Sequence, residues 1–205
     1  APKDRRCFAF FHPAMQDEPI IFVEVALMKD VPSKIEDVLK EKRDIFEPEK
    51  TSVAVFYSIS NCQKGLAGIS FGNFLIKQVA NDLNLEFKNL KKFITLSPVP
   101  GLRKWISNKY PKFEMNLEKY KKPEQFLKVH DTVMGYVGNY FLNSDRLDKM
   151  PNDPVARFHL GNGASLEQIN YLGDASINGI KLSAGLMVNY LYDLDKVEQN
   201  HEQYI

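Results

Sequence analysis

The chain has 205 residues and a mass of 23.5 kDa, which suits one large domain or two very small ones. Hydrophobic residues make up 44 % and charged residues 26 %, a composition typical of soluble globular proteins that excludes disorder and collagen-like repeats. The net charge of +1 argues against a globally basic nucleic-acid binder. Two cysteines and four scattered histidines provide neither a disulfide framework nor the usual zinc hydrolase motif. The most apolar stretch, 20–28, is too short to span a membrane.

In chain order, the first half predicts a mixed α/β protein. Two strands, 7–11 and 20–27, are joined by a Pro-bearing turn. Ser33 is predicted to cap a helix over 33–43, because Glu36 completes a capping box with it. The apolar run 51–59 predicts a central strand buried on both faces. A helix with apolar residues four apart follows at 71–83, and a strand at 93–96 ends before Ser97.

The second half predicts helices and loops over 102–150, with breaks at Pro111 and Pro123. Asn152-Asp153-Pro154 predicts the start of a helix that ends near 161–163. A last strand is expected within 185–194. Since no repeat or low-complexity linker interrupts the chain, we expect one domain over 1–205. The start without Met suggests a processed or excerpted chain, and cysteine usage favours an intracellular location of unresolved compartment.

Charge is distributed unevenly along the chain. The segment 88–128 holds eleven basic and three acidic residues, a balance of +8, which leaves −7 for the remainder. Such a zone suits a polyanion of modest size, for instance a nucleotide phosphate cluster. A solvated lysine-rich surface explains the same count equally well.

The strand, glycine-containing loop and helix over 53–79 could hold a phosphate group. The N-terminus of a helix presents free backbone N–H groups, and Gly65, Gly68 and Gly72 would allow a phosphate to approach them. Neither a P-loop nor a dinucleotide fingerprint is present. A comparable unit in acetyltransferase-type folds holds the coenzyme A pyrophosphate. The same residues also match G-x-S-x-G around Ser70, the nucleophile elbow of α/β-hydrolases, with Asp153 and His159 in the order of a triad.

Two further residues are candidates for catalysis. Ser97 follows a strand and is restrained by Pro98, so its hydroxyl could project into a cleft at the strand end. His159 is predicted near the C-terminal end of a short helix, where the helix dipole would raise its pKa and suit it as a general acid. A turn serine and a helix-capping histidine are the structural alternatives.

Six strings along nearly the whole chain resemble the catalytic domain of malonyl-CoA decarboxylase, in that family's order. The long L-S-P-x-P-G and P-V-A-x-F-H-L-x-N-G-A patterns are the most specific of them. The segment 107–150 resembles the family least. The strings are Arg6-Cys7-Phe8, 53–60, Gly72-Asn73-Phe74-Leu75-Ile76-Lys77, 96–101, 154–164 and Gly185-Leu186-Met187-Val188-Asn189-Tyr190.

The resemblance implies a GNAT-like acyl-CoA-binding fold, α/β (α+β), with a central mixed sheet flanked by helices. It implies Ser97 and His159 as the catalytic pair and associates Tyr192 with the active site. It implies neither a metal nor an organic cofactor, since coenzyme A is part of the substrate. The family usually has Glu where this chain has Ser70, which leaves the complete catalytic set open. The residues predicted to bind coenzyme A are Ser58, Ser60, Gly65, Gly68, Ser70, Gly72 and Asn73.

The activity implied is conversion of malonyl-CoA to acetyl-CoA and carbon dioxide through a thioester enolate, a carboxy-lyase reaction. An acyl-CoA transferase or a non-catalytic coenzyme A module would use the same groove, and a serine hydrolase would use Ser70. No nucleic-acid or membrane partner is expected. The family usually carries an N-terminal helical domain that mediates assembly, so a homo-oligomer formed through that domain is an expectation for the longer protein.

Overall fold

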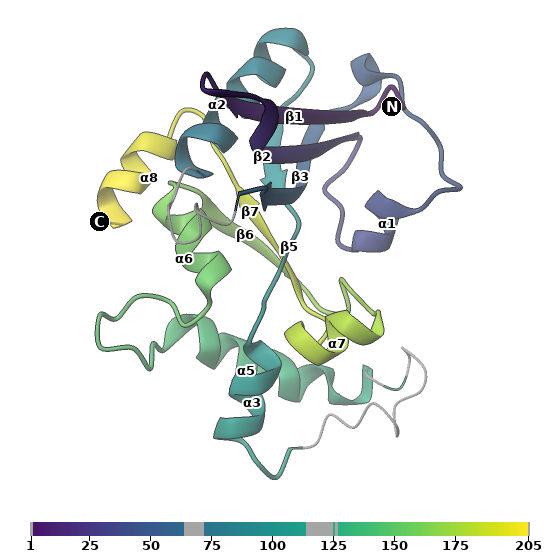
Figure 1. Ribbon diagram of the computed structural model, residues 1–205. Coiled ribbons are helices and arrows are strands. Elements are labelled where there is room, and N and C mark those ends of the chain that lie inside the picture. The colour runs from purple at the N-terminus through teal and green to yellow at the C-terminus, as the bar shows by residue number, and fades with distance from the viewer. Residues whose placement is uncertain (1, 64–71, 114–124, 126, 205) are drawn as a thin grey trace.

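The computed structural model describes residues 2–63, 72–113, 125 and 127–204. Its strands and helices alternate irregularly along the chain (Figure 1). In chain order they are β1 (Arg5–His12), β2 (Met15–Met28), α1 (Ile35–Leu39), the 3-10 helix η1 (Pro48–Lys50), β3 (Val53–Asn61), α2 (Gly72–Glu86), β4 (Lys92–Thr95), β5 (Ser97–Pro98), α3 (Leu102–Lys109), the 3-10 helix η3 (Leu127–Val129), α5 (His130–Leu142), α6 (Pro154–Gly161), β6 (Ser165–Asn170), α7 (Ile177–Ser183), β7 (Met187–Leu191) and α8 (Val197–Tyr204).

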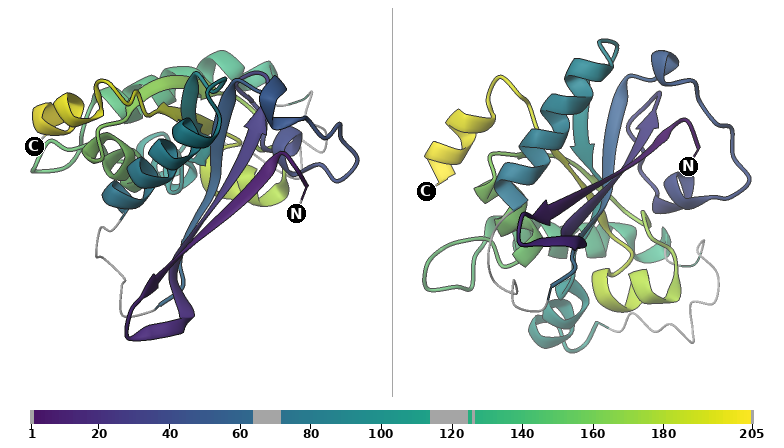
Figure 2. Two further views of the ribbon diagram at one scale, coloured as in Figure 1. Left: turned by 90° about the horizontal axis from the view of Figure 1, so that it is seen from above. Right: turned by 45° about the horizontal axis from the view of Figure 1, so that its top comes forward.

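The described strands form one mixed sheet, which confirms the predicted fold class. Its order is β1-β2-β3-β4-β7-β5, with β6 on the other edge of β7. All neighbours are antiparallel except β3 and β4, which are parallel. The parallel pair requires a crossover, and α2 provides it. The β1–β2 hairpin projects well beyond the helices (Figure 2).

The predicted central strand is buried on both faces, as expected from its apolar sequence. Ala54 and Phe56 belong to a large core with the apolar face of α2, while Val53 and Val55 face a smaller cluster that includes Val38 of α1. All four side chains are at most 3 % exposed. Because alternate residues of a strand point to opposite faces, one strand supplies both cores.

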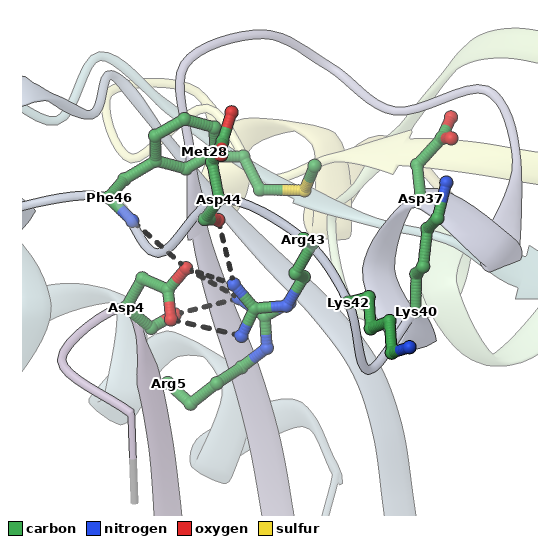
Figure 3. Close-up of a pocket in the computed structure, with 9 residues that line it drawn as sticks. All are labelled: Asp4, Arg5, Met28, Asp37, Lys40, Lys42, Arg43, Asp44 and Phe46. Carbon is green, nitrogen blue, oxygen red and sulfur yellow. Dashed lines mark hydrogen bonds and ion pairs between the residues drawn. The ribbon is translucent and has the colours of Figure 1, made fainter.

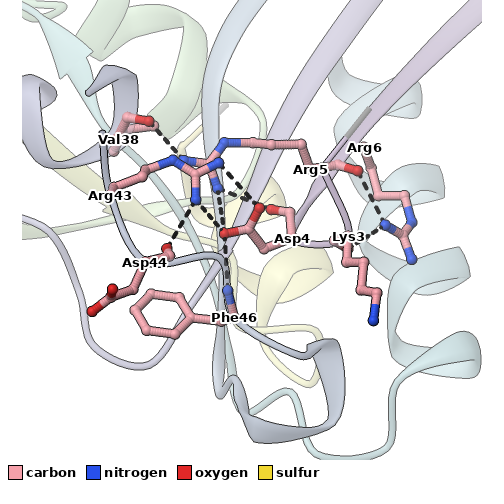
Figure 4. A network of polar contacts seen from close by, with 8 residues as sticks. All are labelled: Lys3, Asp4, Arg5, Arg6, Val38, Arg43, Asp44 and Phe46. Atoms are coloured by element: carbon pink, nitrogen blue, oxygen red, sulfur yellow. Dashed lines mark hydrogen bonds and ion pairs between the residues drawn. The ribbon is translucent and has the colours of Figure 1, made fainter. Parts of the chain in front are cut away.

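The predicted capping box at Ser33 is wrong. Helix α1 has Lys34 as its N-cap without a side-chain cap, and the first backbone N–H, that of Ile35, donates to Gly173 O at 2.8 Å. The helix also ends at Leu39 rather than near residue 43. Beyond Leu39 the chain continues as a loop, in which the Arg43 guanidinium binds the fully buried carboxylate of Asp4 (Figures 3 and 4).

This carboxylate is held from several sides. Arg43 Nη2 donates to Asp4 Oδ1 at 3.1 Å, Phe46 N–H donates to Oδ2 at 3.3 Å, and Arg5 Nη1 lies 3.4 Å from Oδ2. Arg5 also donates to Val38 O at 2.7 Å, which connects β1 to α1. Both arginines are among the residues that line a hollow of about 660 Å³ (Figure 3). The network therefore fixes the loop after α1 against β1.

Among the described elements, β6, α7 and α8 were not predicted, and neither were the short β5 and η1. Strand β6 is mostly exposed and polar, so it lacks an apolar pattern, and it forms by pairing with β7. Helices α7 and α8 are short, and the Ser176 hydroxyl caps α7 by accepting from Gly179 N–H at 3.0 Å.

Across the part of the chain that the structure describes, no helix is long and apolar enough to cross a membrane.

Candidate active site

Ser97 lies where the chain passes from β4 to β5. Its backbone pairs with Val188 of β7, and the next turn is fixed by Val99 N–H, which donates to Ser183 Oγ of α7 at 3.1 Å. The side chain is 7 % exposed. Ser97 thus follows the end of β4, as predicted, and itself begins β5, where neighbours on β7 and α7 restrain it.

His159 reaches Ser97 from α6. The predicted helix start is confirmed, because Asp153 Oδ1 accepts from Ala156 N–H at 2.7 Å and Pro154 occupies the first turn. His159 in the last turn places Nε2 3.1 Å from Ser97 Oγ. Its ring stacks on Tyr190 of β7, with centroids 4.7 Å apart. Sixty-two residues separate serine and histidine in sequence, so tertiary packing alone brings them together.

The chain turns sharply after α6, at the glycine of the predicted N-G-A string. Gly163 has φ +81°, and a Cβ there would lie 1.9 Å from Val197 O. Only glycine fits such a position without strain. This close approach lets α8 pack beside α6. Packing therefore accounts for the glycine at position 163, without a role in catalysis.

Tyr192 completes a chain of three side chains. It directly follows β7, its backbone N–H donates to Phe93 O at 2.8 Å, and its hydroxyl lies 2.9 Å from His159 Nδ1. Both ring nitrogens of His159 therefore have a partner. Exposure falls from 7 % at Ser97 to 3 % at His159 and 1 % at Tyr192. The structure thus brings the three predicted catalytic residues together, with Ser97 outermost.

The expectation of a raised pKa for His159 is wrong. Burial lowers its pKa to about 3, since the imidazolium would lose its hydration. The effect of the helix C-terminus is too small to compensate. Burial also raises the pKa of Tyr192 far above its usual range, so that its hydroxyl keeps its proton. At neutral pH, one nitrogen of His159 donates a hydrogen bond and the other accepts one.

Asp153 is another buried titratable group near the hydrogen-bonded residues Ser97, His159 and Tyr192. Burial raises its pKa to about 6, although backbone N–H groups and Arg157 act in the opposite direction. Its second oxygen, Oδ2, lacks a hydrogen-bond partner among the described residues, as does the hydroxyl of Tyr190. Burial, and after it the negative charge of Asp153, raises the pKa of Tyr190, which stacks on His159.

Thr95 is a site residue that the sequence reasoning missed. Its hydroxyl lies 3.0 Å from Ser97 Oγ and accepts the backbone N–H of Tyr190 at 3.2 Å. Thr95 is 1 % exposed. Side chains two residues apart on an extended chain lie on the same face. A hydroxyl residue two positions before Ser97 was therefore the sequence signal that could have identified Thr95.

Beside Ser97, strands β3 and β4 separate. Their parallel pairing runs from Val53–Lys92 to Phe56–Thr95, after which β4 leads to Ser97 and β7. Among the described residues, β3 from Ser58 to Asn61 pairs with β2 and has no strand on its other edge. An unpaired edge of this kind can bind an extended, amide-containing ligand.

The residues predicted to bind coenzyme A divide into two groups. Ser58 and Ser60 are half-buried on the separated part of β3, and Gly72 and Asn73 open α2. Gly65, Gly68 and Ser70 lie outside the described residues.

In the basic segment 88–128, Lys92 and Lys109 form ion pairs with Glu167 and Asp145 at 2.9 and 3.1 Å.

Comparison with known proteins gives consistent matches over the whole chain. A family model described as the malonyl-CoA decarboxylase C-terminal domain matches residues 1–205. The mitochondrial malonyl-CoA decarboxylase of Anser anser anser is 33 % identical over 98 % of this chain and 47 % of its own length. That of Rattus norvegicus is 32 % identical, with 98 % and 48 % covered. The chain thus spans about half the length of the curated relatives it matches.

Solved structures give the same result. The malonyl-CoA decarboxylase of Rhodopseudomonas palustris superimposes with a TM-score of 0.87 and 49 % identity, covering 98 % of this chain and 49 % of that one. The GphF GNAT-like decarboxylase, solved with isobutyryl-CoA, has a TM-score of 0.53 at 15 % identity, covering 92 % and 77 %. The second likeness assigns a GNAT-like fold. The first, with the family match, is specific: the chain belongs to the malonyl-CoA decarboxylase C-terminal domain family.

Proposed function

We propose that this domain decarboxylates malonyl-CoA to acetyl-CoA and carbon dioxide. The observation that carries the proposal is the buried hydrogen-bonded chain from Ser97 through His159 to Tyr192. It ends at a strand separation where an acyl chain could enter. The malonyl-CoA decarboxylases among the relatives and solved structures support this substrate.

The chemistry requires stabilisation of negative charge more than a strong base. Loss of carbon dioxide from a malonyl thioester leaves a carbanion that is delocalised onto the thioester oxygen. A donor held at that oxygen lowers the barrier, because its dipole is already oriented when charge develops. The carboxylate must also stand perpendicular to the thioester plane in a poorly hydrated place. The α-carbon then takes up a proton to give acetyl-CoA.

Within this scheme, Ser97 is the residue that meets the substrate. It is the most exposed of the three, and its hydroxyl can donate to the malonyl group. His159 remains neutral, since burial lowers its pKa to about 3, and we assign it the role of a donor to Ser97 Oγ rather than of a cationic acid. Tyr192 holds the imidazole through Nδ1. Decarboxylation needs no nucleophilic attack by serine, so a neutral histidine is sufficient.

The coenzyme A portion is assigned to the separated edge of β3 and the start of α2. Backbone groups of β3 beyond Phe56 lack a strand partner on the β4 side among the described residues, and Ser58 and Ser60 lie there. The N-terminus of the 15-residue helix α2 favours a phosphate through its free N–H groups. We therefore propose that Ser58, Ser60, Gly65, Gly68, Ser70, Gly72 and Asn73 border the bound coenzyme A.

The test is to incubate the protein with malonyl-CoA and follow the formation of acetyl-CoA. We expect turnover by the unmodified protein and a loss of kcat of about 100-fold or more in Ser97→Ala and His159→Ala. Calorimetric binding of coenzyme A should change little in both. His130→Ala, an exposed histidine on α5, serves as the matched control and should keep full activity.

Two other results would replace the proposal. Tight coenzyme A binding without turnover of malonyl-CoA would indicate a binding module or an acyl-CoA transferase. Labelling by a fluorophosphonate probe that disappears in Ser70→Ala would indicate a serine hydrolase. We expect no such labelling, because both nitrogens of His159 already have Ser97 and Tyr192 as partners.

A further inference from the structure

Thr95 lies directly behind the serine of the proposed active site. Its hydroxyl is within hydrogen-bond distance of two groups, Ser97 Oγ at 3.0 Å and the backbone N–H of Tyr190 at 3.2 Å. The N–H group can only donate, so it occupies one lone pair of the threonine oxygen. The threonine proton and its second lone pair are thereby left for Ser97.

The hydrogen-bond donors around Ser97 limit the directions in which its own hydroxyl proton can point. A hydroxyl has one proton and accepts at most two hydrogen bonds. If Tyr192 donates to His159 Nδ1, the proton of neutral His159 is on Nε2 and points to Ser97 Oγ. If Thr95 donates as well, both acceptor positions of Ser97 are filled. The serine proton then has no partner within the chain of side chains and is free for a ligand.

We propose that Thr95 is a positioning residue, which donates to Ser97 Oγ and so turns the serine proton towards the thioester oxygen of the substrate. This inference rests on the proposed decarboxylase function. Hydroxyl protons rotate, so the 3.0 Å contact also fits the opposite orientation, in which Ser97 donates to Thr95 and a substrate oxygen would meet only lone pairs. Thr95 thus acts through Ser97, and at 1 % exposure it is not placed to touch the substrate.

The position of Thr95 is itself fixed by a buried amide. Asn189 on β7 donates to Thr95 O at 2.9 Å and to Pro32 O at 3.2 Å, and its own oxygen accepts from Asn170 Nδ2 at 2.6 Å. Asn189 is fully buried. These bonds hold the backbone of Thr95 in place, so its hydroxyl oxygen stays beside Ser97 Oγ.

The test compares three variants of the active protein. Thr95→Val keeps the shape but removes the hydroxyl, and we expect kcat for malonyl-CoA to fall about tenfold, the value of one oriented hydrogen bond. KM should change less than about twofold, because no substrate contact is lost. Thr95→Ser should restore kcat to near the original value. Thr51→Val is the matched control: its hydroxyl is also buried and donates to Pro48 O at 2.6 Å, but at the far end of the β3–β4 pair.

The possible results are distinguishable. An unmodified protein without turnover contradicts the proposed function, whereas an active protein with unchanged kcat in Thr95→Val overturns only the present inference. A rise in KM at constant kcat, or failure of Thr95→Ser to restore kcat, also overturns it. If Thr95→Val does not fold, Thr95→Cys replaces it, since a thiol donates only weakly. We expect a several-fold lower kcat there, and a full rate would overturn the inference.

Discussion

Removing the hydroxyl of Tyr192 tests the proposed hydrogen-bonded chain at its buried end. The Tyr192→Phe change keeps the ring that packs in the core and deletes only the group 2.9 Å from His159 Nδ1. The imidazole then has no partner at Nδ1 to hold its proton on Nε2. The other tautomer becomes accessible, in which Nε2 accepts from Ser97 and withdraws the serine proton from the substrate.

The size of the effect follows from burial. His159 is 3 % exposed, so water does not replace the lost partner easily. An unsatisfied buried acceptor costs about 1–3 kcal/mol, and a tenfold change in rate corresponds to about 1.4 kcal/mol. We therefore expect kcat to fall between about fivefold and 150-fold. KM for malonyl-CoA should change little, because Tyr192 lies behind His159 at 1 % exposure.

The assay is steady-state formation of acetyl-CoA, with a thermal unfolding curve for each variant. Tyr136→Phe provides the control, because its ring stacks on Tyr110 with centroids 3.9 Å apart and takes no part in the bonds of His159. Full kcat in Tyr192→Phe, with stability like that of the control, would refute the reasoning. A raised KM at constant kcat would assign Tyr192 to substrate binding instead.

Three predictions concern pH and buried charge. Because burial lowers the pKa of His159 to about 3, the pH profile of kcat should show no inflection near pH 6.5 from this residue. An inflection there that persists in Asp153→Asn would contradict a neutral imidazole. Asp153 has its pKa raised to about 6, so its contribution to stability is present below about pH 4 and lost as pH rises through 6. Asp153→Asn keeps an acceptor for the cap and should be up to about 3 kcal/mol more stable in urea at pH 8, with the gap closing towards pH 4. Arg43→Met leaves the buried Asp4 short of a partner and should cost about 3 kcal/mol at pH 7 by urea unfolding. An unchanged urea midpoint in either variant would contradict the corresponding account.

Much of the fold was predictable because the signals are local. The apolar run 51–59 specifies a strand buried on both faces, and β3 occupies that position. Asp153 and Pro154 specify the start of α6 within a few residues. Elements without a local signal were missed or misjudged. Strand β6 is polar and exists by pairing with β7, and α1 ends at Leu39, before a loop in which Arg43 binds Asp4.

For the site, the sequence by itself determined which residues are present and where the local chain places them. Ser97 follows a strand, His159 lies in the last turn of a helix, and Tyr192 follows another strand. Tertiary structure alone decided that they touch and that burial lowers the histidine pKa to about 3. The reason is physical. Strand and helix signals arise from neighbours in sequence, whereas desolvation and hydrogen-bond partners come from segments about 30 to 100 residues away.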